Sequence, residues 1–269
     1  MKPKTLFATI LCMFVLQDAT AQIKLTQDTI SCPIIGFTFG TTIPSNNLSS
    51  ENGMYDLYKP PYLNFGLEAS YKTKTNYLFS VDGVLTIGGD NLRDRNIRLG
   101  DVYTHDASPI VAGTNGTDAN VTCYNRGLTF RLGIGKIFTI NDQNPNSGIV
   151  TRLFGGFMNQ KTIFFMNDVN APQLQGDYAR LYDHSRFGGI LTESIGFWYM
   201  SKDYNVVNIY VAFELTQCWS HSTRDYVIDY QMGLQGPDNN KYFDLIYGLK
   251  ICWMIPLKGK TAYDYHLLY

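Results

Sequence analysis

Downstream of Leu16 the sequence lacks any uninterrupted apolar run of the roughly 20 residues that a membrane-spanning helix needs. It also lacks a charge excess, because 22 Lys and Arg residues face 23 Asp and Glu residues and no basic run occurs. A nucleic-acid partner is therefore not expected. The glycines at Gly88-Gly89 and Gly133-Ile134-Gly135 are not followed by a helix, so a nucleotide site is not expected either.

Cysteine is scarce and irregularly spaced. Cys12 lies near the N-terminus, and the other four are Cys32, Cys123, Cys218 and Cys252. This spacing matches neither a disulfide framework nor a zinc site. We therefore expect mostly buried thiols, with a Cys123–Cys218 bridge as an alternative because both residues fall near the outer ends of expected strands.

The N-terminus has the pattern of a secretory signal peptide. Lys2 and Lys4 precede an apolar stretch from Leu6 to Leu16, and the small-residue pattern Ala19-Thr20-Ala21 follows. The stretch is too short to anchor the chain as a helix. We predict a signal peptide over residues 1–21 and a periplasmic segment over residues 22–33.

The strongest signal is a period-two alternation near the C-terminus. Every odd position from Phe243 to Leu257 is apolar, whereas the even positions include Asp244 and Lys250. One apolar face and one mixed face are typical of a membrane-barrel strand, which separates lipid from lumen. Without a membrane helix, a closed barrel is the remaining membrane-compatible architecture, because it satisfies all backbone hydrogen bonds internally.

The same alternation recurs along the chain and predicts eight strands. The expected strands are 34–44, 63–71, 77–87, 125–138, 149–164, 190–200, 207–215 and 243–257. Arg152, the Gly155-Gly156 pair and Glu193 interrupt the pattern in the fifth and sixth strands. A bulge or a register shift would explain these interruptions.

Connection lengths support this fold. Short polar turns at 74–76, 141–148 and 201–204 alternate with long connections at 45–60, 89–122, 167–188 and 222–241. We predict an all-β, eight-stranded antiparallel transmembrane β-barrel over 34–257, with short periplasmic turns, long extracellular loops and a periplasmic tail over 258–269. The aromatic residues expected at the membrane interfaces are Tyr62, Tyr71, Tyr77, Tyr124, Tyr199, Trp219 and Trp253.

Five charged residues fall on the inward face of the expected strands. They are Glu68, Asp82, Arg131, Glu214 and Lys250. We expect them to form a structural ion-pair network in which Glu214 approaches Lys250, and a proton or ion relay is the alternative. Side chains fill a barrel of eight strands, so an open pore is not expected.

Few residues suggest catalysis or metal binding. Ser220-His221-Ser222 lies at the outer end of the seventh strand, with Glu193 on the lipid side of the sixth, which leaves a lipid-modifying enzyme as an alternative. His105, His184 and His221 fall in or beside outer loops without metal-ligand spacing. We expect no enzyme activity, no cofactor and no metal.

The final strand, from Tyr247 to Leu257, is closest to a known family. The chain resembles the small outer-membrane barrels of Bacteroidota, within the broad class of OmpA-like and OmpW-like barrels. The resemblance implies outer-membrane lipids as surroundings and a non-catalytic role as a subunit of a larger assembly or secretion complex. The outer loops and the tail after Leu257 would be the contact surfaces. Barrels of this class usually lack such a tail. A stand-alone structural or adhesin-like barrel is the alternative.

Overall fold

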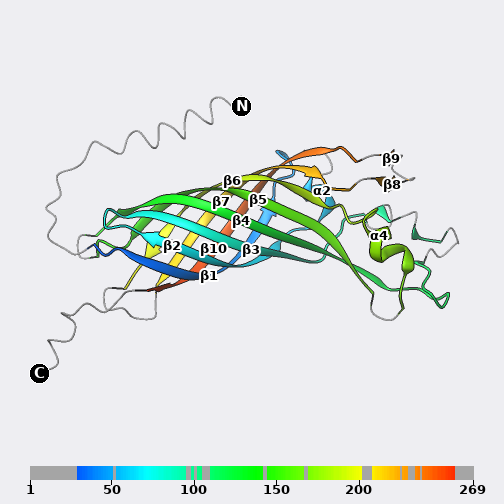
Figure 1. Ribbon diagram of the computed structural model, residues 1–269, viewed down its shortest axis with the longest axis horizontal. Coiled ribbons are helices and arrows are strands. Elements are labelled where there is room, and N and C mark those ends of the chain that lie inside the picture. Colours follow the sequence, from blue (N-terminus) through cyan, green and yellow to red (C-terminus); the bar gives the residue numbers. More distant parts are fainter. Residues whose placement is uncertain are drawn as a thin grey trace, which may run out of the picture.

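The chain forms a closed barrel of eight antiparallel strands, which confirms the predicted fold (Figure 1). The computed structural model describes residues 29–257 except 51–52, 95–97, 100–101, 105–109, 142–143, 167–168, 202–207, 225, 230–233 and 237. The barrel strands are β1 (Cys32–Pro44), β2 (Tyr62–Lys72), β3 (Tyr77–Asp90), β4 (Val121–Thr139), β5 (Gly148–Met166), β6 (Arg186–Tyr199), β7 (Ile209–Ser222) and β10 (Lys241–Pro256). Each pairs with its sequence neighbours, and β1 closes the ring against β10.

The predicted signal peptide, most of the segment over 22–33, the tail over 258–269 and His105 lie outside the described residues. The remaining elements lie in the long connections. They are α2 (Met54–Leu57), η3 (Pro172–Leu174), α4 (Gly176–Ala179) and the hairpin of β8 (Val227–Asp229) and β9 (Leu234–Gly236). This hairpin is an addition to the predicted strands. Within the described part of the chain, no helix is long and apolar enough to cross a membrane.

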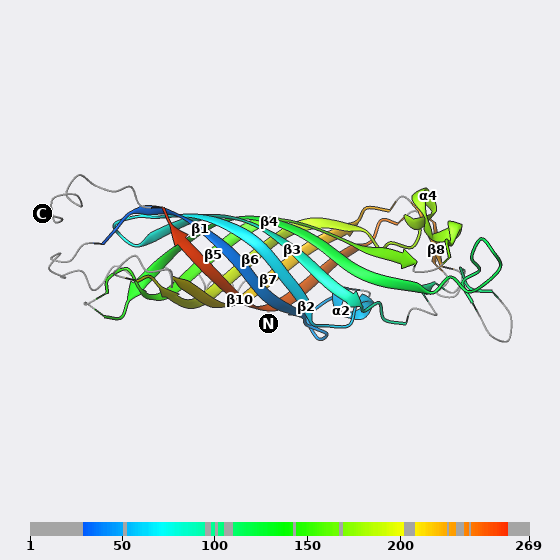
Figure 2. The ribbon, with the colours of Figure 1, turned by 90° about the horizontal axis from the view of Figure 1, so that it is seen from below.

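The connections between strands are short at one end of the barrel and long at the other. The short turns gather at one end, and the long connections with α2, α4 and the β8–β9 hairpin gather at the other (Figures 1 and 2). We call these the turn end and the loop end. The strict alternation of short and long connections along the chain produces this arrangement, because consecutive strands of an antiparallel barrel run in opposite directions.

The outer surface of the barrel is apolar around its whole circumference. Outward side chains such as Phe37, Leu67, Phe79, Leu132 and Leu249 are exposed, whereas charged side chains such as Asp82 are buried in the lumen. A water-soluble protein shows the opposite distribution, with charges outside and large apolar groups inside. The exterior therefore suits lipid acyl chains.

Introducing a charge into this apolar belt should destabilise the barrel. Leu132, on β4, is 57% exposed in the middle of the belt, and Leu132→Arg should cost about 2–4 kcal/mol of folding free energy in vesicles, as for cations at a bilayer midplane. Leu48→Arg is the matched control, because Leu48 is 56% exposed in the connection after β1 and outside the belt. Urea titrations of both variants in phospholipid vesicles measure the difference. Equal costs would contradict the membrane placement.

The register of β5 and β6 is regular, so the bulge or shift expected there is wrong. Both strands keep their phase, with Arg152 facing the lumen and Glu193 facing outward. The irregularity lies in β3, between Ile87 and Asp90. There the Arg126 Nη1 donates a hydrogen bond of 2.9 Å to the carbonyl oxygen of Gly88. Arg152 therefore shares the inward face with apolar residues of β5, and Glu193 shares the outward face with apolar residues of β6. Strand pairing is not broken at either residue.

Two further expectations concern single residues. Tyr62 is not an interface aromatic, because its side chain points inward and is fully buried, with its hydroxyl donating to the carbonyl oxygens of Met54 and Tyr58 at 3.3 Å each. Cys123 and Cys218 are buried thiols, so the alternative of a disulfide between them is wrong. Both belong to the apolar cluster at the loop end of the lumen.

Candidate functional site: the closed lumen

The inward charges predicted from the sequence meet at one level of the lumen. The structure brings Glu68 of β2, Asp82 of β3, Arg131 of β4, Glu214 of β7 and Lys250 of β10 together, and all five are buried. They come together because inward positions alternate regularly along each strand and the ring is narrow enough for long side chains to reach across it.

Arg131 connects two of the carboxylates. Its Nε and Nη2 donate to the two carboxylate oxygens of Asp82 at 2.8 and 2.6 Å, which is the bidentate geometry that makes such pairs strong. Its Nη1 lies 3.1 Å from Glu214 Oε2. A single guanidinium therefore binds both β3 and β7 to β4.

Lys250 and Arg152 complete the set of partners. The Lys250 Nζ lies 2.9 Å from Glu68 Oε2, 2.9 Å from Asp82 Oδ2 and 3.8 Å from Glu214 Oε1. The Arg152 Nη1 lies 2.5 Å from Glu68 Oε1. Each of the three carboxylates thus contacts at least one cation, and Lys250 contacts all three.

The complete network holds three cations and three carboxylates and is formally neutral. We call Glu68, Asp82, Arg131, Arg152, Glu214 and Lys250 the ionic layer. The ring of Phe154 lies at its centre, with its centroid 5.0 Å from Arg131 Cζ, 5.7 Å from Arg152 Cζ and 5.4 Å from Lys250 Nζ. Cations over a ring face are attracted to its π electrons. The layer therefore has internal partners for every one of its charges.

Sequence reasoning missed Arg152 as a member of this layer. The signal was present, because Arg152, Met158 and Gln160 share the even phase of β5, and all three are buried. The inward Phe154 obscured this signal. A large apolar residue on the polar face looks as if the strand had shifted by one residue, so that its inward and outward positions were exchanged. The remaining inward charges that the sequence prediction left out are Lys72, Arg186 and Asp244.

An apolar cluster closes the lumen below the ionic layer, toward the turn end. Trp198 and Tyr210 are fully buried there, with ring centroids 5.7 Å apart, and the Arg152 guanidinium lies 4.9 and 4.3 Å from their centroids. We call this cluster the lower layer. Its buried members are Cys32, Ile34, Leu78, Ile137, Val150, Trp198, Met200, Tyr210, Ala212, Cys252 and Met254.

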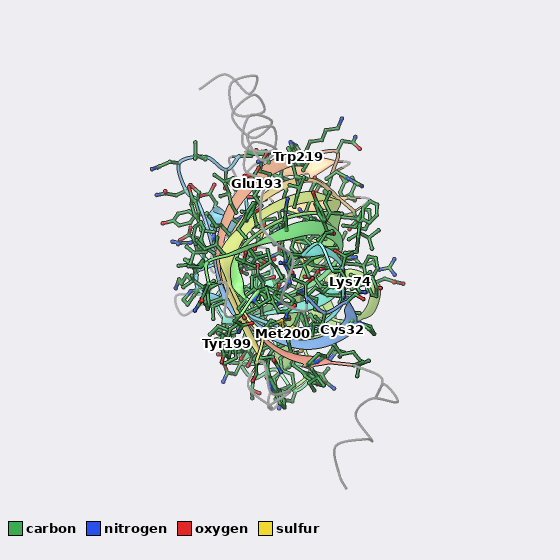
Figure 3. The ribbon with its side chains drawn as sticks, turned by 90° about the vertical axis from the view of Figure 1, so that its left-hand side faces the viewer. Cys32, Lys74, Glu193, Tyr199, Met200 and Trp219 are labelled. Carbon is green, nitrogen blue, oxygen red and sulfur yellow. The ribbon has the colours of Figure 1, made fainter. Side chains whose placement is uncertain are left out.

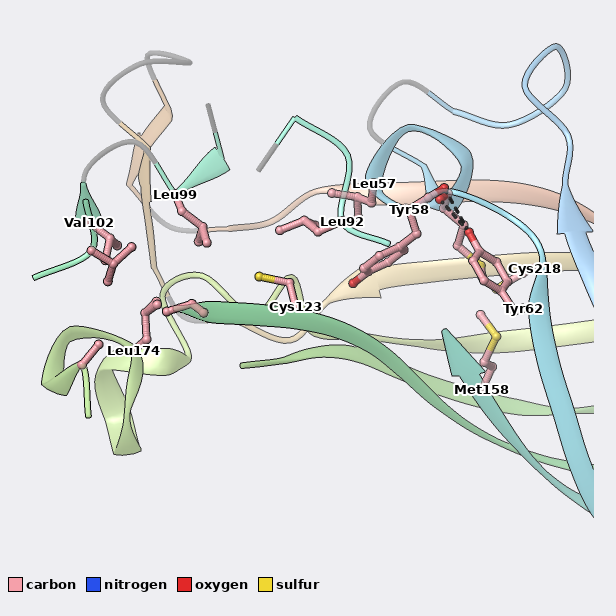
Figure 4. Packing of buried hydrophobic residues seen from close by; sticks show 14 of the residues in the cluster. Leu57, Tyr58, Tyr62, Leu92, Leu99, Val102, Cys123, Met158, Leu174 and Cys218 are labelled. Carbon is pink, nitrogen blue, oxygen red and sulfur yellow. Dashed lines mark hydrogen bonds between the residues drawn. The ribbon is translucent and has the colours of Figure 1, made fainter. Parts of the chain in front are cut away.

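A second apolar cluster closes the loop end of the lumen, and we call it the upper layer. In it, Met54, Leu57 and Tyr58 of the connection after β1 pack with strand residues such as Met158 (Figure 4). Tyr58 shares a hydrogen bond of 2.7 Å with Thr162 of β5. A cavity of about 70 Å³ lies between this layer and the ionic layer, with room for a few water molecules. The described side chains therefore close the lumen at three levels.

The structure separates the residues considered for catalysis. His221 points outward, with its ring 6.2 Å from that of Phe187, whereas Ser220 and Ser222 point into the lumen and are buried. Ser222 donates a hydrogen bond of 2.6 Å to Asp238 instead. Adjacent strand residues face opposite sides of the barrel wall, so no serine and histidine pair forms here.

His184 and His221 do not form a metal site with the acidic residues of the described chain. Among the described residues, no group of three or more His, Cys, Asp or Glu side chains is arranged to hold a metal ion. His184 lies in the connection before β6, where burial and nearby Arg224, Arg98 and Arg186 lower the pKa of its imidazole well below the usual value. A neutral side chain is therefore expected there at physiological pH.

The long connections are joined to each other at the loop end. The Arg224 Nη2 lies 2.7 Å from Asp238 Oδ2, and its Nη1 donates to the carbonyl oxygen of Leu181 at 3.0 Å. Burial raises the pKa of Asp238, but the hydrogen bond from Ser222 and the charge of Arg224 outweigh burial and hold it below its usual value. Arg224 thus joins the connection after β7 to the connection before β6, and we call the surface around Arg224, Asp238 and Leu181 the outer cap.

Known proteins resemble this chain only distantly. No protein-family model and no curated protein matches the sequence. The attachment invasion locus protein Ail of Yersinia pestis is similar over 85% of this chain and 99% of its own, with 10% identity and a TM-score of 0.35. The outer membrane protein OprG from Pseudomonas aeruginosa is similar over 85% of this chain and 97% of its own, with 12% identity and a TM-score of 0.34. Neisserial surface protein A is similar over 82% of this chain and 98% of its own, with 9% identity and a TM-score of 0.33. At such scores the strand pairing of the chain itself defines the fold.

Proposed function

We propose that this chain is a non-catalytic β-barrel of the Gram-negative outer membrane that acts as an accessory subunit of a larger membrane complex. The closed lumen carries this proposal, because a barrel filled at three levels offers no open passage. Function then depends on the outside of the barrel. The outer-membrane location is supported by the expected signal peptide and by the apolar belt.

Two outside surfaces are available to partners. The outer cap presents connected loops on the extracellular side, and the flank of the barrel presents lipid-facing side chains. The resemblance to Bacteroidota barrels suggests the type of complex, one for protein assembly or secretion. The predicted C-terminal tail would add a periplasmic contact.

A stand-alone structural or adhesin-like barrel is the second candidate function. The observation that favours it is the outer cap, since Arg224 binds Asp238 and the carbonyl oxygen of Leu181 and so joins two of the loops through contacts within the chain. A pre-ordered loop surface suits direct binding at the cell surface, because less conformational entropy is lost on binding.

Purification from gently solubilised native membranes separates these two functions. A tagged chain expressed at its natural level should co-purify with at least one membrane protein in a fixed ratio, measured by quantitative mass spectrometry and native mass. An unrelated barrel with the same tag, prepared identically, serves as the control for trapped lipid and abundant proteins. A solitary monomer would contradict the subunit role and favour the stand-alone barrel.

A further inference from the structure

We propose that the flank centred on Glu193 binds a different integral membrane protein, which presents an arginine or lysine to Glu193 near the bilayer midplane. The flank consists of the outward faces of β5, β6 and β7. This proposal rests on the proposed role as a subunit and names the membrane-embedded surface through which the subunit would bind.

Glu193 lies in the middle of the apolar belt. On β6 the outward positions run from Phe187, near the loop end, to Tyr199, at the turn end, and Glu193 is midway between them. Figure 3, viewed along the barrel, places Glu193 at the periphery, on the same flank as Trp219. A carboxylate at this depth faces acyl chains, where ionisable groups are costly and usually have a functional partner.

Among the described residues, no cation pairs with this carboxylate, and the amide of Gln217 is the polar group nearest to it on β7. The direct neighbours of Glu193 across the sheet are Leu153 on β5 and Leu215 on β7, and neither has a polar side-chain atom. Its Oε1 is buried and has no hydrogen-bond partner among the described residues. The buried carboxylates of the ionic layer, by contrast, all contact cations. The described barrel therefore gives Glu193 no opposite charge.

The surface around Glu193 leaves room for close approach. Gly155 on β5 and Gly189 on β6 both face outward, and a side chain built at either would meet open space. Leu153, Leu191 and Leu215 are less exposed than most outward residues of the belt. A low surface beside an acidic group lets another membrane segment approach closely and place a donor on the carboxylate.

A second copy of this chain does not supply that donor. The outward cations of the described strands lie toward the strand ends, at Arg126, Lys136, Lys161 and Lys241. Glu193 of one copy would therefore meet apolar side chains, another Glu193 or uncharged polar groups such as the amides of Asn159 and Gln217. Charge complementarity requires a cation at the midplane, so the partner is a different protein that carries one in its membrane span.

Site-specific photo-crosslinking in native membranes tests the proposal. Benzoylphenylalanine in place of Leu191 or Leu215 should form an adduct with one integral membrane protein, whereas the same residue in place of Phe65, on the opposite flank, should not. Glu193→Leu should lower the adduct yield by about tenfold or more, because it removes one partner of a desolvated charge pair. Glu193→Gln should lower it less. The crosslinked peptide should lie in the partner's membrane span, and replacing its Arg or Lys with Leu should have the same effect.

Controls separate the possible failures. Heat-modifiable mobility on gels should be unchanged in Glu193→Leu, which shows that the barrel folds. Adducts with lipid alone, an adduct with a second copy of this chain, or a yield that Glu193→Leu does not alter would each overturn the proposal. If such a result occurs while stoichiometric partners still co-purify, only the Glu193 surface is wrong. If no partner co-purifies, the subunit role itself is wrong.

Discussion

Replacing Arg131 with methionine should lower the free energy of unfolding by about 3–5 kcal/mol, the usual cost of removing one partner from a buried ion pair. Methionine keeps much of the volume but none of the charge. Asp82 loses two hydrogen bonds and Glu214 loses its partner at 3.1 Å, which leaves the layer with two cations for three carboxylates. Urea unfolding in phospholipid vesicles, followed by tryptophan fluorescence, measures the change.

Restoring neutrality provides the matched control. The double variant Arg131→Met with Asp82→Asn has two cations and two carboxylates, so it should recover part of the stability lost in Arg131→Met. Recovery would show that the cost comes from uncompensated charge and not from altered packing against Phe154. A single variant as stable as the unaltered chain would contradict the role of the ionic layer.

The same geometry argues against the alternative of a proton or ion relay. A relay needs a connected chain of polar groups to both ends of the barrel. The two layers beside the ionic layer are largely apolar, and the hydrogen bonds that continue from Glu68 through Ser70 to Ser80 stay between β2 and β3. The network is therefore best understood as a crosslink between β2, β3, β4, β5, β7 and β10.

Much of the fold could be predicted from the sequence because a barrel strand has two environments and a period of two. Each outward face borders lipid, so its apolar residues were visible without any tertiary information, as in Phe243 to Leu257. Strand number, the alternation of short and long connections, and the inward side of Glu68, Asp82, Arg131, Glu214 and Lys250 followed from this pattern.

The loop end could not be predicted in the same way. Met54, Leu57 and Tyr58 close the lumen through contacts with distant strand residues, such as Tyr58 with Thr162, and irregular loops have no period that shows which side chains are buried. The Gly88 bulge and the β8–β9 hairpin likewise depend on local backbone geometry. The sequence pattern showed that Glu193 faces outward, but it could not show that no cation of the described strands lies beside its carboxylate.

The lower layer should be about as sensitive to substitution as the ionic layer. Trp198→Ala should cost about 3–5 kcal/mol, because the substitution removes a fully buried ring and leaves a cavity that nothing fills. Trp253→Ala is the matched control, since Trp253 on β10 is 44% exposed on the lipid side. Lipid chains can occupy the space that it leaves, so its cost should be clearly smaller. Urea unfolding of both variants in vesicles measures the two costs.

Closure at three successive levels also determines what Trp198→Ala does to conductance. The unaltered barrel should give no resolvable current steps in planar bilayers, and neither should Trp198→Ala, because the ionic layer and the upper layer still block the lumen. Trp198→Ala should thus lower the free energy of unfolding strongly without raising the conductance. Ion conduction through Trp198→Ala would show that the lower layer alone closes the barrel and would contradict closure at three levels.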